Sequence, residues 1–121
     1  MTDGAQDLPW GSQWDLVAAA DGSVNWARFL VTLGFQDGRA GGKAPVNRYF
    51  GQCRQRTAGQ VELGPFGMTM MAGPPEAMAA EATYVALLES VRGYRGGADQ
   101  LELLNADGEP VLVFGPSADP E

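Results

Sequence analysis

Residues 47–51, Asn-Arg-Tyr-Phe-Gly, form the stretch of this chain that decides its fold. A second run, Met-Thr-Met-Met-Ala at residues 68–72, follows it, and Glu81 comes next inside an apolar helical pattern. Amide, hydroxyl, aromatic and carboxylate groups in this order are compatible with a catalytic site or with an internal structural contact. The rest of the sequence is needed to choose between these two interpretations.

The composition limits the partners that this chain can bind. Its 121 residues suffice for one domain, and eight Lys and Arg against fifteen Asp and Glu give a formal charge of −7. Phosphate contacts need clustered positive charge, so we expect no nucleic-acid or anionic-membrane surface. Arg48, Arg54 and Arg56 lie close in sequence, but such a run is more typical of an exposed strand face than of a phosphate site.

The counts of cysteine and histidine exclude several chemistries. The chain has a single cysteine, Cys53, and no histidine, which rules out Ser-His-Asp and Cys-His nucleophiles and the usual zinc sites. We therefore expect no enzyme activity, no metal and no cofactor, and Cys53 as a packed side chain. Residues 1–7 lack the apolar run of a signal peptide or transmembrane segment. A cytoplasmic protein is expected, with a removed export or lipoprotein leader as the alternative.

Alternating apolar residues predict an antiparallel sheet. The segment from Trp10 to Ala18 alternates with period two, as in a strand with one buried face. Residues 28–43 do the same around Asp37-Gly38, which favours a two-residue hairpin turn. The pair at residues 41–42, Gly-Gly, indicates a bulge or a close backbone crossing. Two further hairpins are expected, from residues 52–56 with 60–63 and from residues 101–105 with 110–114.

One segment has the period of a helix instead. Met78, Glu81, Val85 and Leu88 recur at three- and four-residue steps within residues 75–92. The predicted order is therefore strands, helix, strands, with antiparallel pairing and one main helix, which indicates the α+β class. The domain is expected to span residues 9–115, with flexible tails at residues 1–8 and 116–121.

The ordered set of motifs resembles a known family. It comprises a tryptophan strand, Asn-x-Tyr-Phe-Gly from Asn47, Gly-Pro-x-x-x-Thr-x-Met-Ala from Gly64, a helix with an inward Glu81, and a closing hairpin around Asp107-Gly108. Together these are similar to the META domain of the HslJ-like heat-shock proteins, across residues 10–114. The resemblance implies a compact α+β domain of bacterial stress proteins, with an antiparallel, partly barrel-like sheet packed against one main helix. It implies no catalytic activity and no cofactor.

Two departures from the family pattern occur together. Members commonly carry Gly-Cys-Asn where this chain has Pro45-Val46-Asn47, and Met-Ala-Cys where it has Met71-Ala72-Gly73. We expect positions 46 and 73 to lie close together and to form a disulfide in exported members. A chain kept in a reducing compartment has no use for that bond.

Glu81 needs partners whatever the family. Helical geometry directs its carboxylate to the face that packs on the sheet, where an unpaired charge is costly. We expect it to fasten the helix to the Asn47 segment; catalysis and ligand binding are the alternatives. The residues predicted to form this structural motif are Asn47, Arg48, Tyr49, Gly51, Thr69, Met71 and Glu81.

Two functions fit these expectations. The first is a stress-associated structural or interaction module, with a protein partner docked on an exposed sheet edge or apolar patch. The second is a carrier of a small hydrophobic ligand or lipid, in a cavity at the barrel mouth lined by Trp14, Phe29, Phe35 and methionines. An enzyme using Glu81 or Tyr49 ranks third. The methionines at 68, 70, 71 and 78 are expected in the core beside the helix.

Overall fold

The computed structural model describes residues 12–20, 22, 24–55, 57, 59–96 and 99–117. Trp10, Arg56, residues 1–8 and residues 118–121 lie outside the described residues, and with them most of the predicted tails. The described part contains one α-helix, α1 (Pro75–Glu89), and a 3₁₀ turn, η1 (Trp26–Arg28). Its strands are β1 (Gln13–Ala19), β2 (Thr32–Gln36), β3 (Arg39–Lys43), β4 (Arg48–Gln55), β5 (Val61–Met68), β6 (Gly93–Gly96), β7 (Leu101–Leu104) and β8 (Pro110–Pro116).

The strands form one antiparallel sheet in the order β5-β4-β3-β2-β1-β8-β7-β6. The two ends of the sheet curl toward each other, and an isolated antiparallel bridge joins Gln60 to Gly93. The amide of Val61 donates to the carbonyl of Arg92 at 3.0 Å, and that of Tyr94 donates to Gly59 at 3.0 Å. The sheet is therefore partly barrel-like but not closed, and the predicted α+β class is confirmed.

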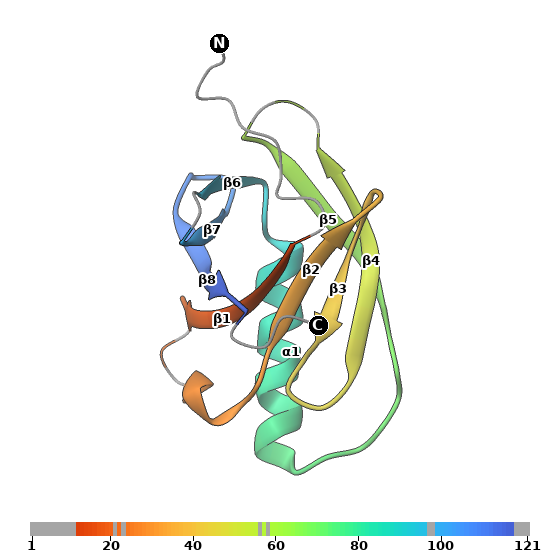
Figure 1. Cartoon of the computed structure of the whole chain (residues 1–121). Helices are drawn as coiled ribbons and strands as arrows, with labels where there is room; N and C mark the ends of the chain where they lie inside the picture. The colour runs from red at the N-terminus through yellow and green to blue at the C-terminus, as the bar shows by residue number, and fades with distance from the viewer. Residues whose placement is uncertain are drawn as a thin grey trace.

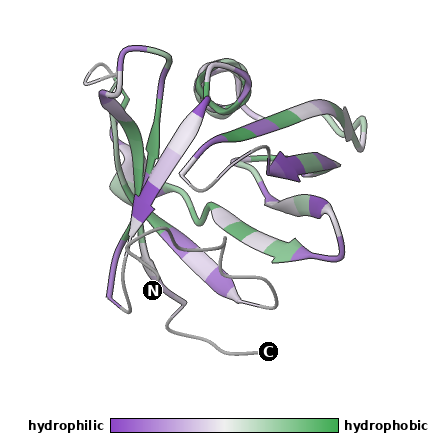
Figure 2. Ribbon diagram, turned by 90° about the horizontal axis from the view of Figure 1, so that it is seen from above, coloured by the Kyte–Doolittle hydropathy of each residue, from purple (hydrophilic) through white to green (hydrophobic). Residues whose placement is uncertain are grey.

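Helix α1 lies within the curve of the sheet (Figure 1). Figure 2, which looks along the helix, shows strands on both sides of it, with hydrophobic residues on many of the segments nearest to it. Pro75 occupies the first turn and Glu76 favours its positive end. The helix ends at Glu89 and not at residue 92, because the backbone of Arg92 pairs with Leu104 and Val61 of the sheet.

The buried face of α1 differs from the predicted one. Ala77, Ala80, Glu81, Tyr84 and Leu88 are buried, whereas Met78 is exposed at the surface. Apolar residues occur nearly all round this helix. The hydrophobic period therefore does not distinguish the observed buried face from one rotated by a single residue. The small alanines let the helix approach the sheet closely. The prediction for Glu81 and Leu88 is confirmed, and that for Met78 is wrong.

The interior is filled by side chains from both layers. The helix contributes Tyr84 and Leu88, and the sheet contributes large side chains that are also fully buried, among them Leu33, Phe35, Leu112 and Phe114. The methionines take little part in this core. Met70 is 93% exposed and Met71 is 56% exposed, while Met68 is half-buried against the core. The predicted methionine core is wrong for Met70 and Met71, because the connection from β5 to α1 runs over the surface, whereas Met68 packs against the core as predicted.

The hairpin of β2 and β3 forms as the sequence predicts. Asp37 and Gly38 both have positive φ, 53° and 81°, as a two-residue turn of this kind requires. Gly41 and Gly42, which follow in β3, mark a close approach to the neighbouring backbones. Neither the pairing of β3 with β2 nor that with β4 shifts register here. A Cβ on Gly42 would lie 2.3 Å from the carbonyl oxygen of Thr32, and one on Gly41 would lie 2.7 Å from that of Tyr49.

The hairpin of β4 and β5 is longer than predicted. Strand β4 begins at Arg48 and β5 continues to Met68, so residues 48–51 of the first quoted motif and Met68 of the second lie in paired strands. Two features hide this from the sequence. The register shifts between Gly51 and Cys53, and Gly64 has a φ of 101°, which breaks the alternation. The closing hairpin of β7 and β8 agrees with its prediction.

Candidate functional site

The carboxylate of Glu81 lies under the connection between β3 and β4. Its Oε1 accepts hydrogen bonds from the backbone amides of Val46 at 2.8 Å and Asn47 at 2.7 Å. Its Oε2 accepts one from Nδ2 of Asn47 at 2.8 Å. Glu81 is only 5% exposed, so these three donors replace the water that the charge has lost.

Asn47 connects this carboxylate to the chain that follows β5. Its Oδ1 accepts from the amide of Met71 at 2.7 Å and from the hydroxyl of Thr69 at 2.9 Å, and its Nδ2 also donates to the carbonyl of Met71 at 3.1 Å. The Thr69 hydroxyl in turn accepts from the amide of Arg48 at 3.1 Å. We call Asn47, Thr69, Met71 and Glu81 the clasp, because they tie two connections to the helix.

Hydrogen bonds, not an ion pair, hold the charge of Glu81. Burial opposes its ionisation, but the bonds from the Asn47 side chain and from the amides of Asn47 and Val46, with Lys43 nearby, keep its pKa below the ordinary value. Lys43 directs its ammonium to the carbonyls of Leu30, Ala44 and Pro45. With a lowered pKa and both oxygens occupied, Glu81 is poorly suited to act as a general acid or base.

A tyrosine pair lies beside the clasp. The hydroxyl of Tyr49 donates to the carbonyl of Thr32 at 2.6 Å, and the hydroxyl of Tyr84 therefore donates to Tyr49, at 2.7 Å. The two rings meet edge to face, with centroids 5.4 Å apart. Burial raises the pKa of both hydroxyls, which stay protonated and structural.

Gly51 and Arg48 have different places in this motif. A Cβ on Gly51 would lie 2.7 Å from Cδ1 of Phe66, so its absence lets that ring reach Tyr49, at a centroid distance of 5.7 Å. Arg48 contributes its backbone amide, and its side chain is exposed on the outer face. The structure thus brings together the predicted motif residues with the exception of the Arg48 side chain.

Val46 and Gly73, where relatives are expected to carry cysteines, lie side by side. A Cβ placed on Gly73 would be 3.5 Å from the Cβ of Val46. Disulfides have Cβ atoms about 3.5–4.5 Å apart. The geometry therefore suits a bridge between these two positions, although neither residue here can form one.

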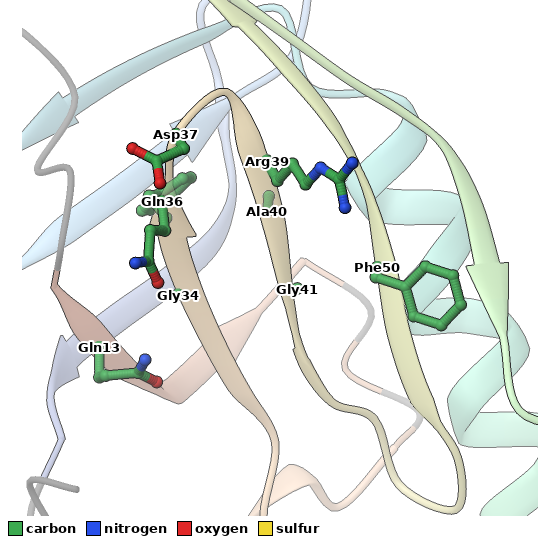
Figure 3. Close-up of a pocket in the computed structure, with 9 residues that line it drawn as sticks. Gln13, Gly34, Gln36, Asp37, Arg39, Ala40, Gly41 and Phe50 are labelled. Atoms are coloured by element: carbon green, nitrogen blue, oxygen red, sulfur yellow. The ribbon is translucent and has the colours of Figure 1, made fainter.

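The outer face of the sheet carries a feature that the sequence did not predict. One residue from each of five neighbouring strands lies in register: Gln13, Gly34, Gly41, Phe50 and Gly67. Gly34 and Gly41 of this row line an open groove of about 610 Å³ beside Phe50, which is lined also by Gln36, Asp37 and Arg39 (Figure 3). The spacing of these glycines along the chain does not predict a groove, because only the register of the strands places them in one row.

Phe50 is the exposed aromatic of this row. It is 56% exposed, whereas Tyr49 before it is buried. Its ring extends over Gly67, where a Cβ would lie 2.7 Å from Cε1 of the ring. Alternation in strand β4 thus directs one aromatic to the core and the next to the groove.

Other candidate features are smaller. A pocket of about 260 Å³ lies between η1 and α1 beside Phe29, with Arg28 and Glu76 paired at 2.7 Å on its rim. Burial raises the pKa of Cys53 to about 11 against the opposing effect of Arg54, so the thiol is unreactive. Within the described residues, no three potential ligands gather as a metal site, and no helix has the length and apolarity to cross a membrane.

These features define an α+β domain in which an open antiparallel sheet curls around one helix and is tied to it by a buried carboxylate. A family model of the META domain matches residues 6–118, and the chain belongs to the META domain family. Comparison with curated proteins gives no match.

Two solved structures are similar to this one. An NMR structure of a protein from Burkholderia xenovorans has 26% identity and a TM-score of 0.70, over 91% of this chain and 84% of that one. A second NMR structure, at 18% identity and a TM-score of 0.58, covers 87% of this chain and 88% of that one and supports the fold alone.

Proposed function

We propose that this META/HslJ-like domain is a non-enzymatic, bacterial, stress-associated interaction module that binds a protein partner through the outer groove beside Phe50. The observation that supports this most is the location of an exposed aromatic in an open groove on the side of the sheet opposite the clasp. Exposed apolar groups of this kind are typical of interaction sites. The cytoplasm is the proposed compartment, since Val46 and Gly73 stand where a bridge would fit.

The clasp is unsuited to a catalytic role. Both oxygens of Glu81 and both side-chain polar atoms of Asn47 already have partners within the fold. A substrate would have to displace these bonds at the cost of fold stability. The residues that first suggested a site therefore support the structure, and the function is proposed to lie on the outer face.

The face of the sheet is favoured over its edges as the docking surface. Pro65 interrupts the outer edge of β5 by removing a backbone donor. The edge of β6 is joined to Gln60 and Gly59 through Gly93 and Tyr94. Addition of a partner strand would have to break these contacts.

The carrier hypothesis receives less support. Of the expected cavity lining, Trp14 and Phe35 belong to the packed core, whereas Met70 and Met71 are exposed. Strands lie on both sides of helix α1 (Figure 2), and its Tyr84 and Leu88 side chains are fully buried in the interior. The interaction module is therefore the function that the geometry favours.

Photo-crosslinking in cells tests this proposal. A photoreactive phenylalanine analogue is placed at Phe50 in one variant and at Leu30, which is also exposed but does not line the groove, in a control variant. We expect a discrete protein adduct from position 50, stronger after heat stress, and none from position 30. No adduct at position 50 under any condition, or the same adducts from both positions, would contradict the proposal.

A further inference from the structure

We infer that the occupant of the outer groove is an extended acidic segment of a partner protein, with an apolar side chain against Phe50 and a carboxylate on Arg39. The inference rests on the proposed function and adds the chemistry of the partner. It depends on three observations: backbone exposed at Gly41, side-chain amides along the groove, and an arginine in the lining that forms no ion pair within the described residues.

The floor has room for a chain and not for a bulky group. The amide of Gln13 covers Gly34, where a Cβ would lie 2.9 Å from Nε2, and the ring of Phe50 covers Gly67. For Gly41, between them, the atoms nearest to an added Cβ are the carbonyl oxygen of Tyr49 and the Cα and Cβ of Phe50. From β1 to β4 this row spans three strand spacings, about 14 Å, which equals roughly four residues of extended chain.

The lining suits a peptide backbone. The side-chain amides of Gln13 and Gln36 lie along the groove (Figure 3). An amide offers both donors and an acceptor, so it can bond either polar group of an extended segment. Phe50 then supplies the apolar contact that distinguishes one side chain from another.

Charge selects an acidic segment over a basic one. Arg39 lines the groove on the outer face and lies two residues before Gly41 in β3. Arg48 is exposed and lies two residues before Phe50 in β4. Within the described part of the chain neither side chain forms an ion pair, whereas Arg54 and Arg95 do. Asp37 is the carboxylate in the lining, and it lies at the hairpin turn.

The charge of the whole molecule sharpens this choice. The chain has a formal charge of −7, and Arg39 and Arg48 are exposed cations on either side of Phe50 on the outer face. Guanidinium groups bind carboxylates in a planar, two-pronged geometry. A second copy of the same chain is a poorer occupant, because two molecules of this charge repel each other.

Selection from a library of random displayed peptides tests the inference. The library is first depleted on a variant carrying Arg39→Glu and Phe50→Thr, and then selected on the unaltered chain. We expect enriched peptides with Asp or Glu near an aromatic or aliphatic residue. Enrichment of basic or uncharged sequences, or no enrichment beyond the depleted library, would overturn the inference.

Binding of an enriched peptide is then mapped by NMR on the isotope-labelled chain. We expect the amide signals of Gly34, Gly41 and Gly67 to shift, and affinity to fall about tenfold in Arg39→Glu and again in Phe50→Thr. Arg95→Glu, with the same charge change on β6, and Leu30→Thr should leave affinity within about twofold, as expected of distant surface sites.

The outcomes separate this inference from the proposed function. Shifts confined to another surface, or equal losses in the Arg39→Glu and Arg95→Glu variants, would refute the acidic-segment assignment. Displacement of the peptide by single-stranded RNA or by anionic vesicles at equal charge would point to a general anion site and refute it too. In each case a crosslink at position 50 would still support a partner of different chemistry.

Discussion

Tyr49 and Phe50 are adjacent on β4, yet they belong to two regions with different roles. On the inner face, Tyr49 and the clasp have their polar groups bonded within the fold. On the outer face, Phe50 and Arg39 are exposed, and Gly34 and Gly41 line an open groove. One motif, residues 47–51, thus contributes to both regions: Asn47 and Tyr49 are bonded within the fold, whereas Phe50 faces the outer groove.

The largest expected effect is on the inner face. Glu81→Gln keeps the shape but places an NH₂ group opposite a backbone or side-chain N–H donor of residues 46 and 47. We expect a loss of about 3 kcal/mol in the free energy of unfolding, as for other buried charged groups that lose their bonds. Urea denaturation measures it. Glu76→Gln, at an exposed position of the same helix, is the control and should cost under about 1 kcal/mol. Equal losses of unfolding free energy in Glu81→Gln and Glu76→Gln would show that the buried clasp contributes no more to stability than an exposed position does.

A bridge across the clasp should strengthen the inner region. Val46→Cys with Gly73→Cys is expected to form a disulfide on oxidation and to raise the free energy of unfolding by about 2 kcal/mol over the reduced form. Mass spectrometry under non-reducing conditions detects the bond, and the single Val46→Cys variant controls for the side-chain change. Failure to bridge under mild oxidation would show that the two positions are farther apart than the structure places them.

Lowering the pH should weaken the inner region through Glu81. Its pKa is lowered in the folded chain, so its contribution is complete above the unfolded value of about 4.3 and disappears as the pH falls through the folded value. The difference in unfolding free energy between the unaltered chain and Glu81→Gln should therefore stay constant from about pH 7 to about pH 5 and narrow as the pH falls below about 4.3. A constant difference would mean that the carboxylate charge does not act through the clasp.

The outer region should tolerate change best. Phe50→Thr keeps a strand-forming residue and loses a half-exposed ring, so we expect less than about 1 kcal/mol of destabilisation. Tyr49→Phe, one residue earlier, should cost more, because the Thr32 carbonyl and the Tyr84 hydroxyl each lose a partner. Thermal unfolding of the two variants gives the comparison. The reverse order would assign Phe50 to the fold.

Local patterns explain what could be predicted. The Asp37-Gly38 turn, the antiparallel hairpins, the single helix and the inward Glu81 follow from periodicity and from backbone preferences that act over a few residues. The errors arose where local patterns are ambiguous. Helix α1 is apolar nearly all round, so its period predicts Met78 on the buried face although that side chain is exposed. Met70 and Met71 are apolar and predict core positions, but Tyr84 and Phe35 fill the core instead.

The sequence by itself determined the fold class and the need of Glu81 for partners, because helical and strand periods and the cost of a buried charge are properties of short segments. The tertiary structure decided which donors reach that carboxylate, that positions 46 and 73 meet, and that three glycines and Phe50 form one row. Such contacts depend on strand register and on the curl of the sheet, which join residues far apart along the chain.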